Sequence, residues 1–328
     1  MRSSLLDLLG IDVPVVLAPM GGAVGPELAA AVSEAGALGI LPLWSVDPHV
    51  LRERVRETRA LTQKPIGVNL NLAFPQEERL AAALDEGVPI ISLFWGEASD
   101  LIRRAKAAGA TVLMTVATAD DARRAVDAGA DALVAQGWEA GGHVRGSVAT
   151  MPLVPAVVDA VAPVPVIAAG GISDGRGLAA AMALGAAGAW IGTRFLAARE
   201  ATIHPHYRER VLAARETDTV HLADLYDIGW PDAPHRVLRN SAVDQWEAAG
   251  RPPSGARPRE GEVIGRMGER EIPIYGCVTP QPAAEGEVEA MPMWAGQGVH
   301  LVREVKPAKS ILADMQHEWR QAARRIAP

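Results

Sequence analysis

Glycine residues follow two neighbouring apolar runs in the second half of the chain. Gly170-Gly171 come directly after Val164–Ala169, and Gly192-Thr193 close the following run, Ala189–Gly192. Glycine lets backbone N–H groups approach a ligand, and the start of a helix offers unpaired donors and a partial positive charge. Such loops suit a phosphate dianion when they follow neighbouring strands of a parallel sheet. The spacing therefore predicts a phosphate site between these two loops.

The segment Gln136–His143 combines residues that can contact a ligand and move a proton. It reads Gln-Gly-Trp-Glu-Ala-Gly-Gly-His and follows the apolar run Ala132–Ala135. The Gln136 amide can hydrogen-bond the edge of a heteroaromatic ring, and the paired glycines let the backbone pass close to it. Imidazole is the side chain best matched to proton transfer near neutral pH. We therefore expect His143 to be catalytic and Glu139 to orient the loop.

Two earlier apolar runs also end in residues that suit a ligand. The run Val13–Ala18 is followed by Pro19 and then by Met20-Gly21-Gly22, where backbone and thioether can pack against a flat group. The run Ile66–Leu72 contains Asn69 and Asn71. A buried amide without partners costs about 1–3 kcal/mol, so these side chains need hydrogen bonds. One or both are expected to meet the polar edge of a ligand.

Other residues capable of chemistry carry weaker signals. The remaining histidines of interest are His204, His206, His221 and His235, and no pair has the H-E-x-x-H spacing of a zinc site. Cys277 is the single cysteine, which excludes an intrachain disulfide and a cysteine-cluster metal site. No sequence neighbour would activate this thiol, so we expect it to be inert. No metal site and no G-x-S-x-G nucleophile are predicted.

Eight apolar runs of strand length must position these residues. Helical stretches such as Pro26–Ala35, Pro48–Leu61 and Ala119–Ala128 separate them, and several end in Gly before the next run. Strands that alternate with helices imply a parallel sheet, and eight such units predict a closed (β/α)8 TIM barrel in the α/β class. An open doubly wound sheet is the alternative, but it needs fewer strands and usually an early G-x-G-x-x-G turn. The runs are Val13–Ala18, Leu38–Leu43, Ile66–Leu72, Ile90–Phe94, Thr111–Val116, Ala132–Ala135, Val164–Ala169 and Ala189–Gly192.

The composition changes after the last run. Residues 1–200 are expected to form the barrel core, whereas 201–300, rich in Pro, Gly and charge, are interpreted as a lid or an insertion after the last barrel helix. Residues 301–328 are expected to pack back on the barrel through a helix at Pro307–Ile326. Its apolar residues Ile311, Leu312, Met315 and Trp319 have helical spacing, which suits the bottom of the barrel or its outer ring.

The bulk composition narrows the function class. The chain has 328 residues, 49% hydrophobic and 22% charged, with a net charge of −7 and no basic block. Clustered Lys and Arg are needed to bind nucleic acid, so we expect none. No signal peptide and no membrane span are expected, which favours a cytoplasmic enzyme. We expect a small-molecule substrate as the partner; the sequence does not define the oligomeric state, and a homodimer is one option.

The motifs resemble the nitronate monooxygenase family, formerly called 2-nitropropane dioxygenases. The resemblance lies in Ala18–Gly22, Gly67–Asn69, Gln136–His143, Ala168–Gly177, Ile191–Ala197 and Trp294–Gln297. This FMN-dependent barrel superfamily includes enoyl-acyl-carrier-protein reductase II. The resemblance implies FMN and a catalytic His143. It further implies that the cofactor contacts Met20, Gly21, Gly22, Asn69, Gln136, Gly141, Gly170, Gly171, Trp190, Ile191, Gly192 and Thr193.

The activity implied by this resemblance is oxidation of alkyl nitronates, or of nitroalkanes, by O2 to a carbonyl compound and nitrite. His143 would act as a base if neutral or would attract the nitronate if protonated. The alternative is an NAD(P)H-dependent FMN reductase of an enoyl thioester or a quinone. A flavin-free barrel lyase or isomerase acting on a phosphorylated metabolite, and a non-catalytic binding protein, stay open as further alternatives.

Overall fold

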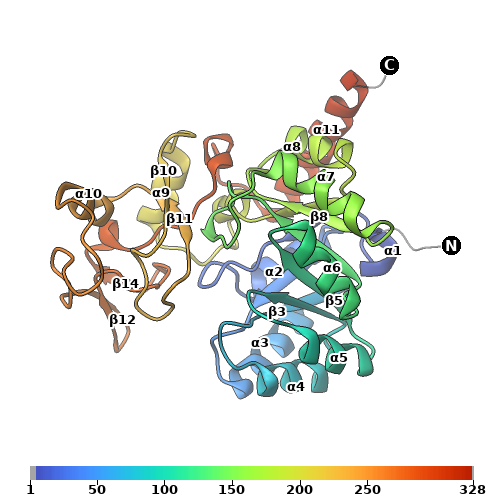
Figure 1. The fold of residues 1–328 in the computed structure, drawn as a ribbon, viewed down its shortest axis with the longest axis horizontal. Coiled ribbons are helices and arrows are strands. Elements are labelled where there is room, and N and C mark those ends of the chain that lie inside the picture. The colour runs from blue at the N-terminus through green and yellow to red at the C-terminus, as the bar shows by residue number, and fades with distance from the viewer. Residues whose placement is uncertain (1–4, 327–328) are drawn as a thin grey trace.

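Eight parallel strands form the centre of the molecule in the computed structural model, which describes residues 5–326 (Figure 1). Residues 1–4 and 327–328, the outer ends of the expected barrel and C-terminal segments, lie outside the described part. The strands follow the order β1-β9-β8-β6-β5-β4-β3-β2, and a parallel bridge between Val16 and Leu38 joins β1 to β2. The fold is therefore the (β/α)8 barrel expected from the sequence. Its strands are β1 (Val15–Leu17), β2 (Gly39–Pro42), β3 (Ile66–Asn71), β4 (Ile90–Phe94), β5 (Thr111–Val116), β6 (Ala132–Gln136), β8 (Val166–Ala169) and β9 (Gly188–Ile191).

Amphipathic helices cover the outside of the barrel and bury one face each against the strands. The buried face of α3, for example, consists of Leu51, Val55 and Thr58. Caps define where several of them begin: the Thr118 hydroxyl accepts from the N–H of Asp121 at the start of α6. The helices are α2 (Pro26–Glu34), α3 (Pro48–Leu61), α4 (Glu77–Asp85), α5 (Ser99–Ala107), α6 (Ala119–Asp127), α7 (Thr150–Val161) and α8 (Gly175–Ala183).

The barrel interior is a packed core, separate from the layer between strands and helices. Alternate strand residues such as Val16, Leu113 and Ile167 form this inner cluster. The short helix α1 (Leu5–Leu9) closes it from below, because Leu5 and Leu9 belong to the same cluster. The bottom of the barrel is thus filled from the N-terminal end of the chain, which leaves the C-terminal helix free for another position.

The C-terminal helix takes the eighth position in the outer ring of helices. Helix α11 (Ala308–Ile326) packs against α8 and α2, and Ile311, Leu312 and Met315 are buried in the barrel core cluster (Figure 1). Contact with α8 is so close that a Cβ atom at Gly175 would lie 2.3 Å from the Met315 carbonyl oxygen. The helix that pairs with β9 is therefore α11. The intervening segment is inserted before the last barrel helix, not after it.

This inserted segment forms a lobe with its own hydrophobic core, built around Tyr207, Tyr226 and Met293 (Figure 1). The dipeptide strand β7 (Gly142–His143) of the barrel joins its first sheet by pairing with β11. The lobe elements are α9 (Pro205–Ala213), β10 (Thr219–Leu222), β11 (His235–Leu238), α10 (Ser241–Ala248), β12 (Val263–Met267), β13 (Arg270–Pro273) and β14 (Ala284–Gly286). Short 3-10 helices lie at Thr193–Ala197, Val288–Ala290 and Gln297–Leu301.

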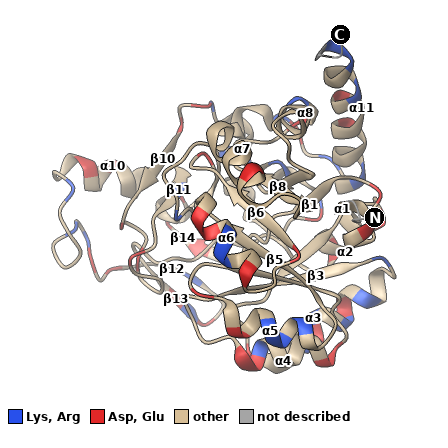
Figure 2. Cartoon of the chain, turned by 45° about the vertical axis from the view of Figure 1, so that its right-hand side comes forward, with Lys and Arg blue, Asp and Glu red and all other residues tan. Residues whose placement is uncertain are grey.

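Lys, Arg, Asp and Glu residues are frequent along the outer helices α3 to α6 (Figure 2), and most of those on α3 are exposed. Many are paired there across a few residues, as Arg123 is with Asp120 at 2.6 Å. Such exposed pairs contribute little to stability, so the apolar clusters dominate the energetics. Among residues 5–326, no helix combines the length and the apolar character needed to cross a bilayer.

Candidate active site

A cavity of about 1180 Å³ opens between the C-terminal ends of the barrel strands and the inserted lobe. A single ligand pocket usually encloses about 300–1,000 Å³, so this cavity has room for more than one molecule. The predicted residues that line it are Met20, Gly21, Gly22, Asn69, Gln136, Gly141, His143, Gly170, Gly171, Trp190, Gly192 and Thr193. Ile191 does not: its side chain is fully buried in the core layer between strands and helices.

The two glycine loops at the ends of β8 and β9 form one end of the cavity. Gly170 and Gly171 have φ angles of 112° and 70°, which L side chains rarely adopt. A Cβ atom at Gly170 would lie 2.8 Å from Oγ1 of Thr150. Thr193 begins a 3-10 helix directly after Gly192. These loops therefore present free backbone where the sequence predicts a phosphate.

The backbone at Gly141 meets a segment from the far end of the lobe. A Cβ atom at Gly141 would lie 2.4 Å from the amide nitrogen of Gly296. The same Gly296 N–H donates to Oγ1 of Thr193 at 3.0 Å. Glu139 holds this loop through its carboxylate, which accepts from the N–H and the hydroxyl of Thr150. Glu139 thus orients the loop, and the glycines leave no side chain in the cradle.

Three amide side chains also line the cavity. Asn69 is buried and donates to the carbonyl and hydroxyl oxygens of Ser92, whereas Gln136 donates to the His143 carbonyl oxygen at 3.1 Å. Asn71 differs, because its Oδ1 accepts from the N–H of Ala73 while its Nδ2 has no partner. That Nδ2 atom is a buried donor at the cavity wall with nothing to donate to.

His143 lies where the barrel and the lobe meet. Its imidazole stacks on Trp230 with centroids 3.8 Å apart and lies 5.1 Å from the Trp294 ring. Burial lowers the pKa of His143 well below its ordinary value, and the neighbouring His235 lowers it further. The side chain can be reached only through the cavity, so His143 is uncharged at neutral pH. A neutral imidazole at this depth can accept a proton from a bound molecule.

Cys277 also contacts His143, the candidate catalytic residue. Its Sγ atom lies 3.7 Å from Nε2 of His143, and it lines the cavity. Burial raises the pKa of the thiol to about 12, so the sulfur stays protonated, consistent with the expected lack of reactivity. Its place in the site was not predicted, because the two residues are 134 positions apart and no local pattern links them.

His235 pairs with His143 across β11 and β7 but has a structural role. Its Nδ1 contacts the Ala233 carbonyl oxygen at 2.9 Å, and its Nε2 accepts from the N–H of Tyr226 at 3.3 Å. Both ring nitrogens are therefore used, which fixes a neutral ring. Burial lowers the pKa of His235 from 6.5 to about 4.

This shift predicts acid destabilisation of the lobe. Between pH 6.5 and pH 4 the unfolded chain binds a proton at His235 that the folded chain does not. The contribution of neutral His235 to the free energy of unfolding is fully present above pH 6.5. This contribution is lost as the pH falls towards 4, and the free energy of unfolding drops by roughly 3 kcal/mol. Urea unfolding at pH 7 and pH 4.5 measures this loss. In His235→Gln the loss should be smaller by that amount; an unchanged loss would contradict the assignment.

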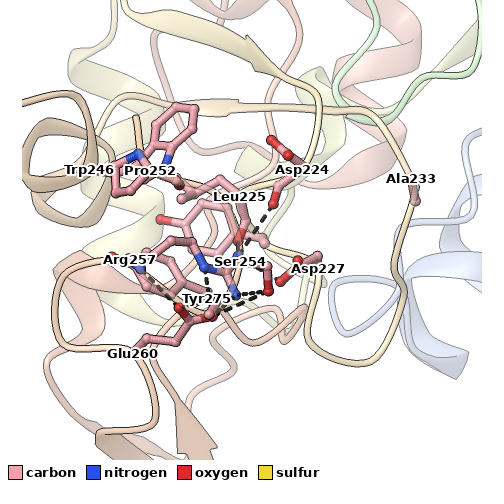
Figure 3. Close-up of polar contacts among 12 residues, drawn as sticks. Asp224, Leu225, Asp227, Ala233, Trp246, Pro252, Ser254, Arg257, Glu260 and Tyr275 are labelled. Atoms are coloured by element: carbon pink, nitrogen blue, oxygen red, sulfur yellow. Dashed lines mark hydrogen bonds and ion pairs between the residues drawn. The ribbon is translucent and has the colours of Figure 1, made fainter. Parts of the chain in front are cut away.

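A buried arginine holds the segment that carries Trp230. Arg257 donates to the carbonyl oxygen of Leu225 and to Oδ1 of Asp227, both at 2.8 Å, and pairs with Glu260 (Figure 3). Its guanidinium lies 4.5 Å from the centroid of the Tyr275 ring. One side chain thereby joins the segment before Trp230 to the segment before Cys277, and it positions both against His143.

Aromatic rings line the side of the cavity opposite the phosphate loops. Trp44 follows β2 and stacks on Phe74, which follows β3, with centroids 5.3 Å apart. Trp230 reaches across from the lobe and lies 5.7 Å from Trp44 and 5.9 Å from Phe74. Phe94 at the end of β4 completes this ring wall. The sequence does not indicate this wall, because Trp44, Phe74 and Trp230 lie in separate loops and Phe94 ends β4.

The residues at the mouth fit a flavin mononucleotide. The glycine loops of β8 and β9 line the cavity without side chains of their own at Gly170, Gly171 and Gly192, which would let backbone N–H groups meet a phosphate. Asn69 and Gln136 line the same cavity and supply amide groups that could meet the polar edge of the flavin ring. Among the described residues, no three acidic, His or Cys side chains lie close enough together to hold a metal ion.

Comparisons with known proteins agree with this geometry. The family model described as nitronate monooxygenase matches residues 2–78 and 71–318. A nitronate monooxygenase of Paraburkholderia phytofirmans is 32% identical over 374 aligned positions, which cover 99% of this chain and 97% of that protein. A (3aS,4S,5R,7aS)-5-hydroxy-7a-methyl-1-oxo-octahydro-1H-indene-4-carboxyl-CoA dehydrogenase of Mycobacterium tuberculosis is 41% identical over 254 residues, covering 76% of this chain and 70% of that one. The structure of FabK from Thermotoga maritima superimposes with a TM-score of 0.85 and 36% identity over 99% of both chains.

Proposed function

The chain belongs to the nitronate monooxygenase family and is a flavin oxidoreductase, and on that premise we propose that it uses FMN and O2 to oxidise nitronates. The observation that supports this most directly is the His143 imidazole, which stacks on Trp230 and lines the same cavity as the glycine loops. In the net reaction, two nitronate anions and one O2 give two carbonyl compounds and two nitrite ions. Bound FMN supplies the redox chemistry.

The residues of this chain position the reactants and move the proton. The loops at Gly170-Gly171 and Gly192-Thr193 would hold the FMN phosphate through backbone N–H groups. Asn69 and Gln136 would meet the flavin ring, and Met20 would pack against it. Because His143 is neutral, it serves as a base rather than as a cation that attracts an anion. We infer that it removes the α-proton of a bound nitroalkane, so that the nitronate arises in the site.

A second candidate function is oxidation or reduction of an acyl thioester. The relative from Mycobacterium tuberculosis is named as a carboxyl-CoA dehydrogenase, and it is more identical over its matched region than the nitronate monooxygenases are. Arg270 also stands exposed at the cavity wall, and within residues 5–326 it forms no ion pair. A free cation at the mouth suits the phosphates of a coenzyme A ester.

One spectroscopic experiment separates these functions. The purified protein should show flavin absorbance and should release nitrite when a nitronate is added in air. Addition of NADH without oxygen should leave the flavin oxidised. Fast bleaching by NADH, or by a saturated acyl-CoA, together with no nitrite release, would instead assign the protein to the second function. A colourless protein that takes up no FMN would contradict both.

A further inference from the structure

The ring wall and one unpaired amide together form a region of the cavity that the proposed flavin contacts leave unused. Trp44, Phe74, Phe94 and Trp230 all line the cavity, and the last of these stacks directly on His143. The rings come from the ends of β2, β3 and β4 and from the lobe, whereas the phosphate loops follow β8 and β9 on the other side. A molecule bound against these rings therefore lies in the same cavity as His143.

The rings form a continuous apolar surface with defined geometry. The Trp44 and Phe74 planes differ by 16°, so they form one stacked pair. Trp230 meets Phe74 and Phe94 edge to face, at interplanar angles of 66° and 82°. Aromatic pairs favour these offset-stacked and edge-to-face arrangements, and a further ring added to such a surface gains the same contacts. A short alkyl chain would contact only a small part of it.

Asn71 lies at the foot of this wall, not beside the phosphate. Alternate residues of β3 face the barrel interior, so Asn71 points the same way as Asn69 but two residues closer to the mouth. The loop that follows carries Phe74, whose N–H donates to the Asn71 carbonyl oxygen at 3.3 Å. The bond from Ala73 to Oδ1 fixes the amide orientation, so it is Nδ2 that lacks a partner.

An unpaired buried donor costs free energy, and an acceptor on a ligand removes that cost. Asn71 is 1% exposed, so bulk water does not satisfy it. A nitro or nitronate group offers two oxygen acceptors. Donation from a neutral amide suits these oxygens whether the group is neutral or anionic.

We propose that Trp44, Phe74 and Asn71 form the substrate subsite, and that it takes a nitro compound or nitronate whose α-carbon carries a planar aromatic ring. The ring lies against Trp44 and Phe74, while Nδ2 of Asn71 donates to an oxygen of the reacting group. The α-carbon then lies between this group and His143. This inference rests on the proposed nitronate oxidation and names its substrate class.

Substrate preference tests the ring contact. The holoenzyme is assayed for nitrite release from the nitronates of phenylnitromethane and 1-nitropropane. We expect kcat/KM to favour the aryl compound roughly tenfold, and Trp44→Leu or Phe74→Leu to reduce that ratio about threefold or more. Trp319→Leu, on the outer face of the barrel, is the matched control and should leave the ratio unchanged.

The outcomes separate this inference from the proposed function. Nitrite release with no aryl preference, or with a preference that Trp44→Leu and Phe74→Leu do not change, would overturn the subsite while the function stands. Release of no nitrite from either nitronate would overturn the function itself. In that case the Kd values of phenylacetate and butanoate still test the contacts of the rings and of Asn71.

Binding of a stable analogue tests Asn71 without turnover. Phenylacetate has the shape and charge of the phenylnitromethane nitronate, and butanoate has those of the propyl compound. Tryptophan fluorescence of the holoenzyme should give a lower Kd for phenylacetate than for butanoate. Asn71→Asp keeps the acceptor for Ala73 but replaces the donor with a carboxylate, so it should raise the Kd of phenylacetate at least tenfold with the flavin still bound.

Two outcomes of the Asn71→Asp experiment would overturn the assignment of Asn71 to the substrate. Loss of flavin from Asn71→Asp, with unchanged phenylacetate binding in the reconstituted protein, would make Asn71 a cofactor ligand and overturn its assignment to the substrate. Unchanged flavin content and unchanged Kd would overturn it as well. Asn71→Ser, which keeps a small hydroxyl donor, should bind phenylacetate better than Asn71→Asp does.

Discussion

Replacing His143 with Asn is expected to leave FMN bound and to lower kcat by about 10²–10⁴, the usual effect of losing a general base. Asn keeps a polar side chain of similar size between Trp230 and Trp294 but cannot accept a proton at neutral pH. Because the His143 side chain makes no contact with the glycine loops in the described structure, the cofactor should stay in place. Flavin absorbance and nitrite release from a nitroalkane measure the two effects separately.

The preformed nitronate gives this experiment its internal control. If His143 only removes the α-proton, the variant should lose turnover with the nitroalkane and keep much more of it with the nitronate. His317→Asn changes an exposed histidine on α11 and should behave as the wild type does. Full activity of His143→Asn with the nitroalkane would remove His143 from the mechanism.

Replacing Gly170 with Ala is expected to weaken FMN binding roughly five- to 150-fold. An L residue at a φ of 112° is strained by on the order of 1–3 kcal/mol, which corresponds to that range. The added Cβ would also lie 2.8 Å from Oγ1 of Thr150 and 3.0 Å from the Gly137 carbonyl oxygen. Relief of this strain would move the loop away from the position in which its backbone N–H groups would meet the phosphate, so FMN binding should weaken. Fluorescence titration of the apoprotein with FMN measures the Kd.

Alanine variants of two other glycines separate the effect of backbone strain from the effect of steric collision. Gly171→Ala meets a positive φ of 70° but has its nearest neighbour at 3.5 Å, so its effect should be smaller. Gly109→Ala has a φ of 82° and open space, and it lies at the end of α5, away from the mouth. It should cost some stability and leave the Kd for FMN unchanged. Equal Kd values for all three variants would show that these loops do not bind the phosphate.

The barrel was predictable because its strands are buried on both faces. The runs Ile90–Phe94 and Thr111–Val116 became β4 and β5 with the same bounds, since an uninterrupted apolar run allows few other placements. The strand ends then placed the site residues, because parallel strands bring their C-terminal ends to one mouth. Ile191 marks the limit of that rule: it is next to Gly192, yet its side chain points into the core layer.

The lobe was not predictable in the same way. Its segments mix charged, Pro and Gly residues with isolated rings, and they fold around a second core that no periodic pattern indicates. Trp230 and Cys277 reach His143 only through that fold, with Arg257 holding their segments together. A contact between distant loops leaves no local trace in one sequence. The proposed substrate side of the site therefore rests on the structure, whereas the proposed cofactor side could be predicted from the sequence.

The position of α11 has a consequence for synthesis on the ribosome. All eight barrel strands, seven ring helices and the whole lobe emerge before residues 308–326, yet the gap between α8 and α2 closes only when this helix docks. Until then the apolar groove that receives Ile311, Leu312 and Met315 faces water. A chain that lacks this helix has a gap in the outer ring of the barrel and exposes an apolar surface that favours aggregation. Docking of α11 therefore covers an apolar surface that chaperones and proteases could otherwise bind.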